Sequence, residues 1–133
     1  MERNSTTAPN GATTLTTKPD AAIIAAFERR AAAFQAACAL PCDPATGGET
    51  EAQSVWWAVI DAAEEEIRAT VATTPRGAEI QLWIAAAYVL NSADDEEACY
   101  RADLDYFEAQ GKSRDWTDRL IIAALRSLRE QGE

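Results

Sequence analysis

Carboxylates are the side chains whose spacing in this chain most resembles a chemical site. Asp61 and Glu64 lie three residues apart, and so do Asp94 and Glu97, which places each pair on one face of a helix. Carboxylate oxygens at this spacing could hold Mg²⁺. A site for nucleotides would also need basic residues for the phosphates, and the second pair falls at a helix start. A hydrolase that uses carboxylates and Mg²⁺ is therefore the least favoured of three functional hypotheses.

Other catalytic arrangements lack their central residue, because the 133 residues include no histidine. Imidazole is the usual general base and activator of nucleophiles, so hydrolysis by a catalytic triad is excluded. Cys38, Cys42 and Cys99 offer at most three thiolates, whereas a structural zinc site takes about four ligands. Lys18 and Lys112 fall in expected loops. We predict a protein that is not an enzyme and needs no cofactor or metal.

Charge and composition restrict the partners. The chain has 22 acidic and 12 basic side chains, a net charge of −10, and 47% hydrophobic residues. This balance disfavours direct contact with nucleic acids or anionic membranes, which both attract basic surfaces. No apolar run approaches the roughly 20 residues that span a bilayer, and no signal segment or disulfide framework is evident. We expect a cytoplasmic protein whose partner is another protein.

Periodicity indicates an all-α fold. Residues 1–16 are rich in Thr, Asn, Gly and Pro and are expected to form a disordered tail, and residues 17–133 one helical domain. Apolar residues recur at helical spacing in five segments joined by short polar turns. These segments are 17–40, 51–71, 75–90, 94–111 and the stretch from residue 113 onward. The third is apolar on nearly all sides, so we predict a five-helix bundle with this helix at its centre.

Terminal residues support these boundaries. Thr17 is a candidate cap for the first helix, and Thr50 with Gln53 matches the capping-box pattern for the second. Thr74, followed directly by Pro75, suits the start of the third helix.

The tryptophans are expected to divide between core and surface. Trp56 lies on the apolar stripe of the second helix and Trp83 in the third, so both are expected in the core. Trp57 lies about 100° further round its helix than Trp56, beside charged residues, and could either pack at the boundary or contact a partner.

Ion pairs four residues apart account for part of the charge. Glu64 with Arg68, Glu97 with Arg101 and Asp115 with Arg119 are favourably oriented on solvated faces. Several acids then have no obvious cation: Asp61, Glu65, Glu66, Asp103, Asp105 and Glu108. If they converged on one surface, they could imitate nucleic-acid phosphates and inhibit a nuclease or defence complex, whereas scattered acids would serve only solubility. Together with Trp57, they are the predicted partner-binding residues.

A second apolar face on the fourth predicted helix suggests self-association. Tyr100, Leu104 and Phe107 share one face, and a second apolar set occupies the other: Ala98, Ala102, Tyr106 and Ala109. A bundle helix needs one buried stripe, so the spare face could pair with a second copy. We predict Tyr100, Leu104, Phe107 and Ile122 as homodimer contacts.

Two resemblances bear on these hypotheses. The acidic pairs loosely resemble the Glu-x-x-Glu and Glu-x-x-Asp pairs of all-α nucleotide pyrophosphohydrolases. The junction of residues 66–77 and the closing Leu-Arg-Ser-Leu at 125–128 resemble small uncharacterised helical proteins of α-proteobacteria, often encoded near prophage or mobile elements. That likeness implies a phage or defence role without site residues. The order of hypotheses is an acidic adaptor or assembly protein, an acidic nucleic-acid mimic, and a Mg²⁺-dependent hydrolase.

Overall fold

The computed structural model describes residues 18–90 and 92–132, and within these ranges it contains helices joined by turns and no strand. The predicted all-α class is confirmed, whereas the predicted count of five helices is wrong. Within the described ranges the structure has six α-helices and one 3₁₀ helix, with the following bounds: α1 Ala21–Ala39, α2 Glu51–Arg68, α3 Pro75–Val89, α4 Ala93–Arg101, α5 Leu104–Gln110, η3 Gly111–Ser113 and α6 Trp116–Gly132. The predicted tail at residues 1–16 lies outside the described residues.

The additional helix arises because the fourth predicted segment breaks at Ala102. This residue has a left-handed backbone, with φ 53° and ψ 45°, and it ends α4. Asp103 then caps α5, because its carboxylate accepts a hydrogen bond from the backbone N–H of Tyr106 at 3.2 Å. Glycine or asparagine usually occupies such a left-handed position, so an alanine gives no signal in the sequence.

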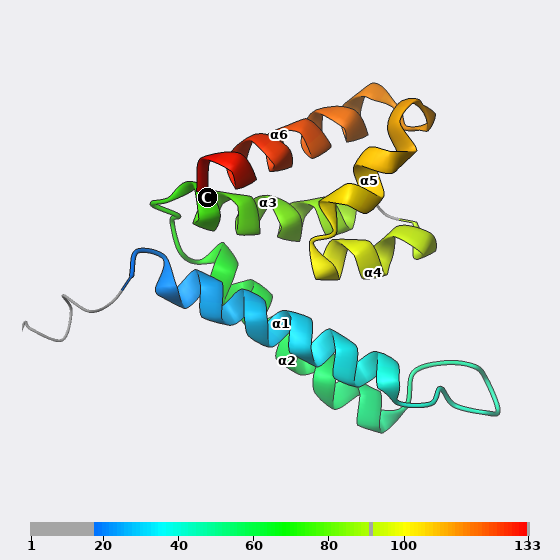
Figure 1. The fold of residues 1–133 in the computed structure, drawn as a ribbon. Coiled ribbons are helices and arrows are strands. Elements are labelled where there is room, and N and C mark those ends of the chain that lie inside the picture. The colour runs from blue at the N-terminus through cyan, green and yellow to red at the C-terminus, as the bar shows by residue number, and fades with distance from the viewer. Residues whose placement is uncertain (1–17, 91, 133) are drawn as a thin grey trace, which may run out of the picture.

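The first layer of the fold is an antiparallel hairpin of α1 and α2, which lie side by side (Figure 1). The predicted capping box is present, with the Gln53 N–H donating to Thr50 Oγ1 and the Thr50 N–H to Gln53 Oε1. The buried Gln53 amide also donates to the carbonyls of Ala37 and Leu40, each at 3.2 Å. One side chain therefore starts α2 and satisfies carbonyl groups at the end of α1.

The second layer contains α3 and α6, which run antiparallel, with α4 and α5 beside them (Figure 1). Trp83, Phe107 and Leu125 are fully buried in the main core between these helices. The prediction of a surrounded α3 is wrong, because Tyr88 and Val89 on its outer side are 67% and 54% exposed. The two hairpin helices mainly cover each other, and thus leave one side of α3 open to solvent.

A single carboxylate joins the beginning of α1 to the turn before α3. Asp20 accepts hydrogen bonds from the backbone N–H groups and hydroxyls of both Thr73 and Thr74. These bonds hold the pKa of Asp20 below its ordinary value. A Cβ on Gly77 would overlap this carboxylate, so only glycine fits there. Thr74 caps α3 as predicted, with Pro75 at its first position, whereas Thr17 lies outside the described residues.

The expectation for Trp56 is wrong, because its side chain is 38% exposed, whereas Trp83 is buried as predicted. α1 is the main neighbour of this part of α2, and it leaves an edge of the Trp56 ring in solvent. Cys38 and Cys42 are exposed, Cys99 is buried, and all three are free thiols as expected. None of the described helices is long and apolar enough to cross a lipid bilayer.

Candidate functional site

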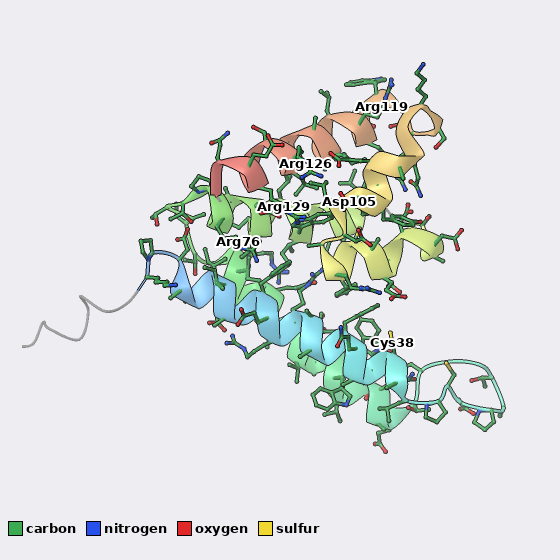
Figure 2. All side chains as sticks on the ribbon, in the orientation of Figure 1. Cys38, Arg76, Asp105, Arg119, Arg126 and Arg129 are labelled. Atoms are coloured by element: carbon green, nitrogen blue, oxygen red, sulfur yellow. The ribbon has the colours of Figure 1, made fainter. Side chains whose placement is uncertain are left out.

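Half of the acids that were predicted to lack a cation have one. Glu66 pairs with Arg29 of α1 at 2.7 Å, and Arg126 of α6 binds both Glu108 at 2.6 Å and Asp105 at 3.2 Å. Figure 2 shows Asp105 and Arg126 on the facing helices α5 and α6. The prediction failed for these acids because their partners come from other helices, which spacing along one helix does not reveal.

The six acids also lie in two separate parts of the fold. Those of α2 belong to the hairpin, whereas Asp105 and Glu108 lie beside α6 and Asp103 caps α5. Asp61 and Glu65 are exposed, and no cation of the described residues lies within 4.0 Å of their carboxylates. Asp103 likewise has no cation within the described residues, but its carboxylate accepts the Tyr106 N–H.

The predicted ion pairs have three different outcomes. Glu97 and Arg101 pair on the surface at 2.6 Å, as expected. Asp115 instead accepts hydrogen bonds from the Thr117 hydroxyl and the Asp118 N–H. Among the described residues, Asp115 and Arg119 do not form an ion pair. A local cap at the start of α6 has replaced this predicted pair.

Glu64 is not on a solvated face, because its side chain is only 2% exposed. Its Oε2 accepts from Arg30 Nε at 2.7 Å and its Oε1 from the Tyr88 hydroxyl at 2.9 Å. The predicted ion pair with Arg68 is also present, at the longer distance of 3.8 Å. The Arg30 guanidinium is completely buried and lies 4.0 Å above the Tyr100 ring centroid. Its two Nη atoms have no hydrogen-bond partner among the described residues.

Sequence reasoning missed Arg30, although a signal was present. It lies three residues after Phe27 and four before Phe34, on the face that α1 buries. A charged residue at such a position indicates a buried partner, here Glu64. Because both carboxylate oxygens of Glu64 carry hydrogen bonds, the pair of Asp61 and Glu64 is not open to a metal ion. Among residues 18–90 and 92–132, no group of three acidic or cysteine side chains is placed to hold one.

The four predicted homodimer contacts are packed inside the chain. Leu104, Phe107 and Ile122 belong to the main core, and Tyr100 stacks on Phe34 with ring centroids 4.1 Å apart. These residues therefore form no exposed stripe for a second copy. The prediction assumed one long fourth helix, whereas the chain breaks at Ala102 and packs most of both apolar sets inward, with Ala109 left exposed.

Trp57 takes the boundary position that was one of its two expected roles. Its ring packs edge-on against Phe34 and Tyr100, with centroids 6.0 and 6.2 Å apart. The neighbouring positions of α2 remain open, with Val55 61% and Trp56 38% exposed. We define the exposed side of α2 by Val55, Asp61 and Glu65 on its outer face, together with Trp56, which lies about 100° round the helix from Val55 at the edge of the buried face. It combines partly uncovered apolar side chains with acids that no cation of the described residues neutralises.

A second buried glutamate lies on α3. Glu79 of α3 accepts hydrogen bonds from Trp83 Nε1 at 2.9 Å and from Arg129 Nε and Nη2 at 3.0 and 2.8 Å. Arg76 adds a longer contact of 3.3 Å. The Arg129 Nη2 also donates to the Ala102 carbonyl, so this network joins α3, α6 and the break after α4.

Comparison with known proteins gives no information on the role of these sites. No protein-family model, curated protein or solved structure matches the chain.

Proposed function

We propose that this protein is a non-catalytic interaction module that binds a partner protein through the exposed side of α2. The observation that carries the proposal is the combination on this one helix of exposed Val55 and Trp56 with Asp61 and Glu65. Tryptophan is strongly enriched among the residues that dominate binding energy at interfaces. A partly exposed indole on the same helix as unpaired carboxylates therefore gives α2 the composition of a contact surface.

The same groups define the chemistry of the partner. Apolar groups would cover Val55 and the Trp56 ring, and lysines or arginines would face Asp61 and Glu65. The net charge of −10 extends this preference to long range, because it attracts basic proteins and repels acidic ones. The proposed partner is thus a basic protein with an apolar contact patch, and a nucleic-acid-binding enzyme is one class with that character.

The other two hypotheses have less support. An acidic mimic needs a continuous array of free carboxylates, whereas here Glu66, Asp105 and Glu108 are neutralised by arginines. A Mg²⁺-dependent hydrolase needs open carboxylates, whereas Glu64 is engaged by Arg30 and Tyr88.

Affinity purification with matched charge variants tests the proposal. The tagged full chain, D61K/E65K and the control E28K/E130K are exposed to nuclease-treated extract of the source cell at low and moderate salt. The control replaces two other exposed acids on α1 and α6, so both variants change the net charge equally. We expect a protein that the wild type and the control retain, that D61K/E65K loses at least tenfold, and that salt weakens.

A third variant, V55S/W56S, tests the apolar half of the surface and should lose the same protein. Identical sets of retained proteins for the wild type and both surface variants would refute the proposal. Light scattering of the purified chain gives a second readout. A dimer that V55S/W56S dissociates would show that the occupant of this surface is another copy of the chain, and the adaptor assignment would then be replaced by self-assembly.

A further inference from the structure

A solvent-open cavity of about 510 Å³ lies where the start of α3 and the ends of α4 and α6 meet α1. Arg76, Arg101 and Arg129 line it together with Phe27 and Glu79. Figure 2 shows Arg76 and Arg129 near each other in the space between α1 and α6. The volume lies within the roughly 300 to 1,000 Å³ of small-molecule sites. The charge of its wall is opposite to that of the chain as a whole.

Neutralisation of Glu79 does not explain this concentration of arginines. Among the described residues that line the cavity, Glu79 has the only carboxylate. Arg129 already binds this carboxylate through two nitrogen atoms. Arg76 contacts it only at 3.3 Å, and Arg101 pairs instead with Glu97 on the surface. With Glu97 counted as the partner of Arg101, three guanidinium groups face two carboxylates, which leaves the wall with a surplus of about one positive charge.

The arginines also retain free hydrogen-bond donors. Arg76 and Arg101 each bond an acidic side chain through Nη1 alone, and Arg129 uses Nε and Nη2. Within the described part of the chain, Nη2 of Arg76, Nη2 of Arg101 and Nη1 of Arg129 have no hydrogen-bond partner. A guanidinium offers five N–H groups in a planar fork that matches the oxygens of phosphates and carboxylates.

We infer that this cavity binds a small molecule that carries a phosphate group. A phosphate monoester is an anion with three strong acceptor oxygens, as many as the three free guanidinium nitrogens, whereas a single carboxylate has two. The Phe27 ring provides an apolar surface next to these donors, with the Arg76 guanidinium 5.7 Å from its centroid. An organic phosphate with an apolar or aromatic group could therefore use both parts of the cavity.

Isothermal titration calorimetry on the purified full chain tests this inference, with inorganic phosphate, phenyl phosphate and citrate as probes at constant ionic strength. We expect saturable binding of both phosphates, with phenyl phosphate the tighter because its ring can contact Phe27. R101Q should weaken phenyl phosphate binding at least tenfold. Arg101 is exposed and does not contact Glu79, so this variant should fold normally, which circular dichroism checks.

The matched control is R119Q, which removes an exposed arginine near the opposite end of α6 (Figure 2). It should bind phenyl phosphate as the wild type does. Three results would each overturn the inference: heats no larger than those of sodium chloride, an R101Q variant that binds like the wild type, or tighter binding of citrate than of either phosphate. The inference and the proposed function fail independently, because this test involves neither α2 nor a partner protein.

Discussion

The molecule contains two buried glutamates whose surroundings differ in one respect. Glu64 in the hairpin and Glu79 in α3 are each 2% exposed, and each binds an arginine from another helix. The partner of Glu64 is Arg30, which is fully buried. The partners of Glu79 are Arg129 and Arg76, which are 28% and 41% exposed on the wall of the cavity.

This difference separates a structural ion pair from a group of charges that can still bind something. The Arg30 guanidinium has no route to solvent, so its charge can serve only Glu64 and the faces of nearby aromatic rings. The arginines around Glu79 keep one side toward water and can turn toward a ligand. A buried carboxylate therefore belongs to a closed structural ion pair where its arginine is buried, and to a site open to ligands where its arginines are exposed.

Removal of the Glu64 charge should have the largest effect. E64Q leaves Arg30 buried without a counter-charge, and breaking a buried pair in this way typically costs about 3 to 5 kcal/mol. Urea denaturation followed by circular dichroism should show this loss of unfolding free energy. The apolar double variant R30M/E64L should be more stable than E64Q, because it removes both charges from the core. A stability of E64Q within 1 kcal/mol of the wild type would mean that Arg30 reaches water.

Titration of the buried Cys99 thiol should show how well the core near Arg30 excludes water. Burial, with the nearby Asp95 carboxylate, raises the pKa of Cys99 to about 11. The folded state then holds its proton more tightly than the unfolded state, whose thiol has an ordinary pKa of about 9. The resulting stability is complete below about pH 9 and is lost as the pH rises toward 11, by about 2 to 3 kcal/mol.

Urea denaturation of C99A at pH 8, 9, 10 and 11 isolates this contribution, because the variant should lose less stability over that range than the wild type. C42A, which removes an exposed thiol, is the control and should follow the wild type. Parallel pH curves for the wild type and C99A would contradict the prediction.

The smallest effect is expected at Glu79. E79Q should lower the unfolding free energy by about 1 to 2 kcal/mol, less than E64Q does, because Arg76 and Arg129 can hydrate through the cavity. The same change removes the negative charge from the wall, so phenyl phosphate should bind more tightly to E79Q than to the wild type. Equal losses of unfolding free energy for E64Q and E79Q in urea would contradict the conclusion that the Glu64 site is closed to solvent and the Glu79 site is open.

Local features of the structure could be predicted well because their causes are local. Thr50 with Gln53, and Thr74 with Pro75, satisfy backbone groups within a few residues of themselves, so their types reveal the helix starts. The pair of Glu97 and Arg101 is likewise set within one helix turn. Ala102 could not be predicted, because an alanine adopts a left-handed conformation only where the surrounding structure imposes it.

The candidate surfaces were only partly visible. Asp61 and Glu65 remain free as the sequence indicated, because no basic residue from another helix reaches them within the described chain. Glu66, Asp105 and Glu108 gained arginines from α1 and α6, and Asp103 became the cap of α5. Tyr100, Leu104 and Phe107 packed inside the chain once the fourth segment broke in two. The arginine-lined cavity had no sequence signal, since its three arginines lie at the ends of three different helices.

The sequence by itself determined the all-helical class, most helix starts and the acidic character, because these follow from periodicity, capping chemistry and composition. The tertiary structure alone decided which charges are neutralised, which aromatics stay exposed and where arginines gather. Ion pairing and burial depend on distances between helices that are far apart in the chain, and on the angles at which short turns set those helices. Spacing along one helix carries no information about either.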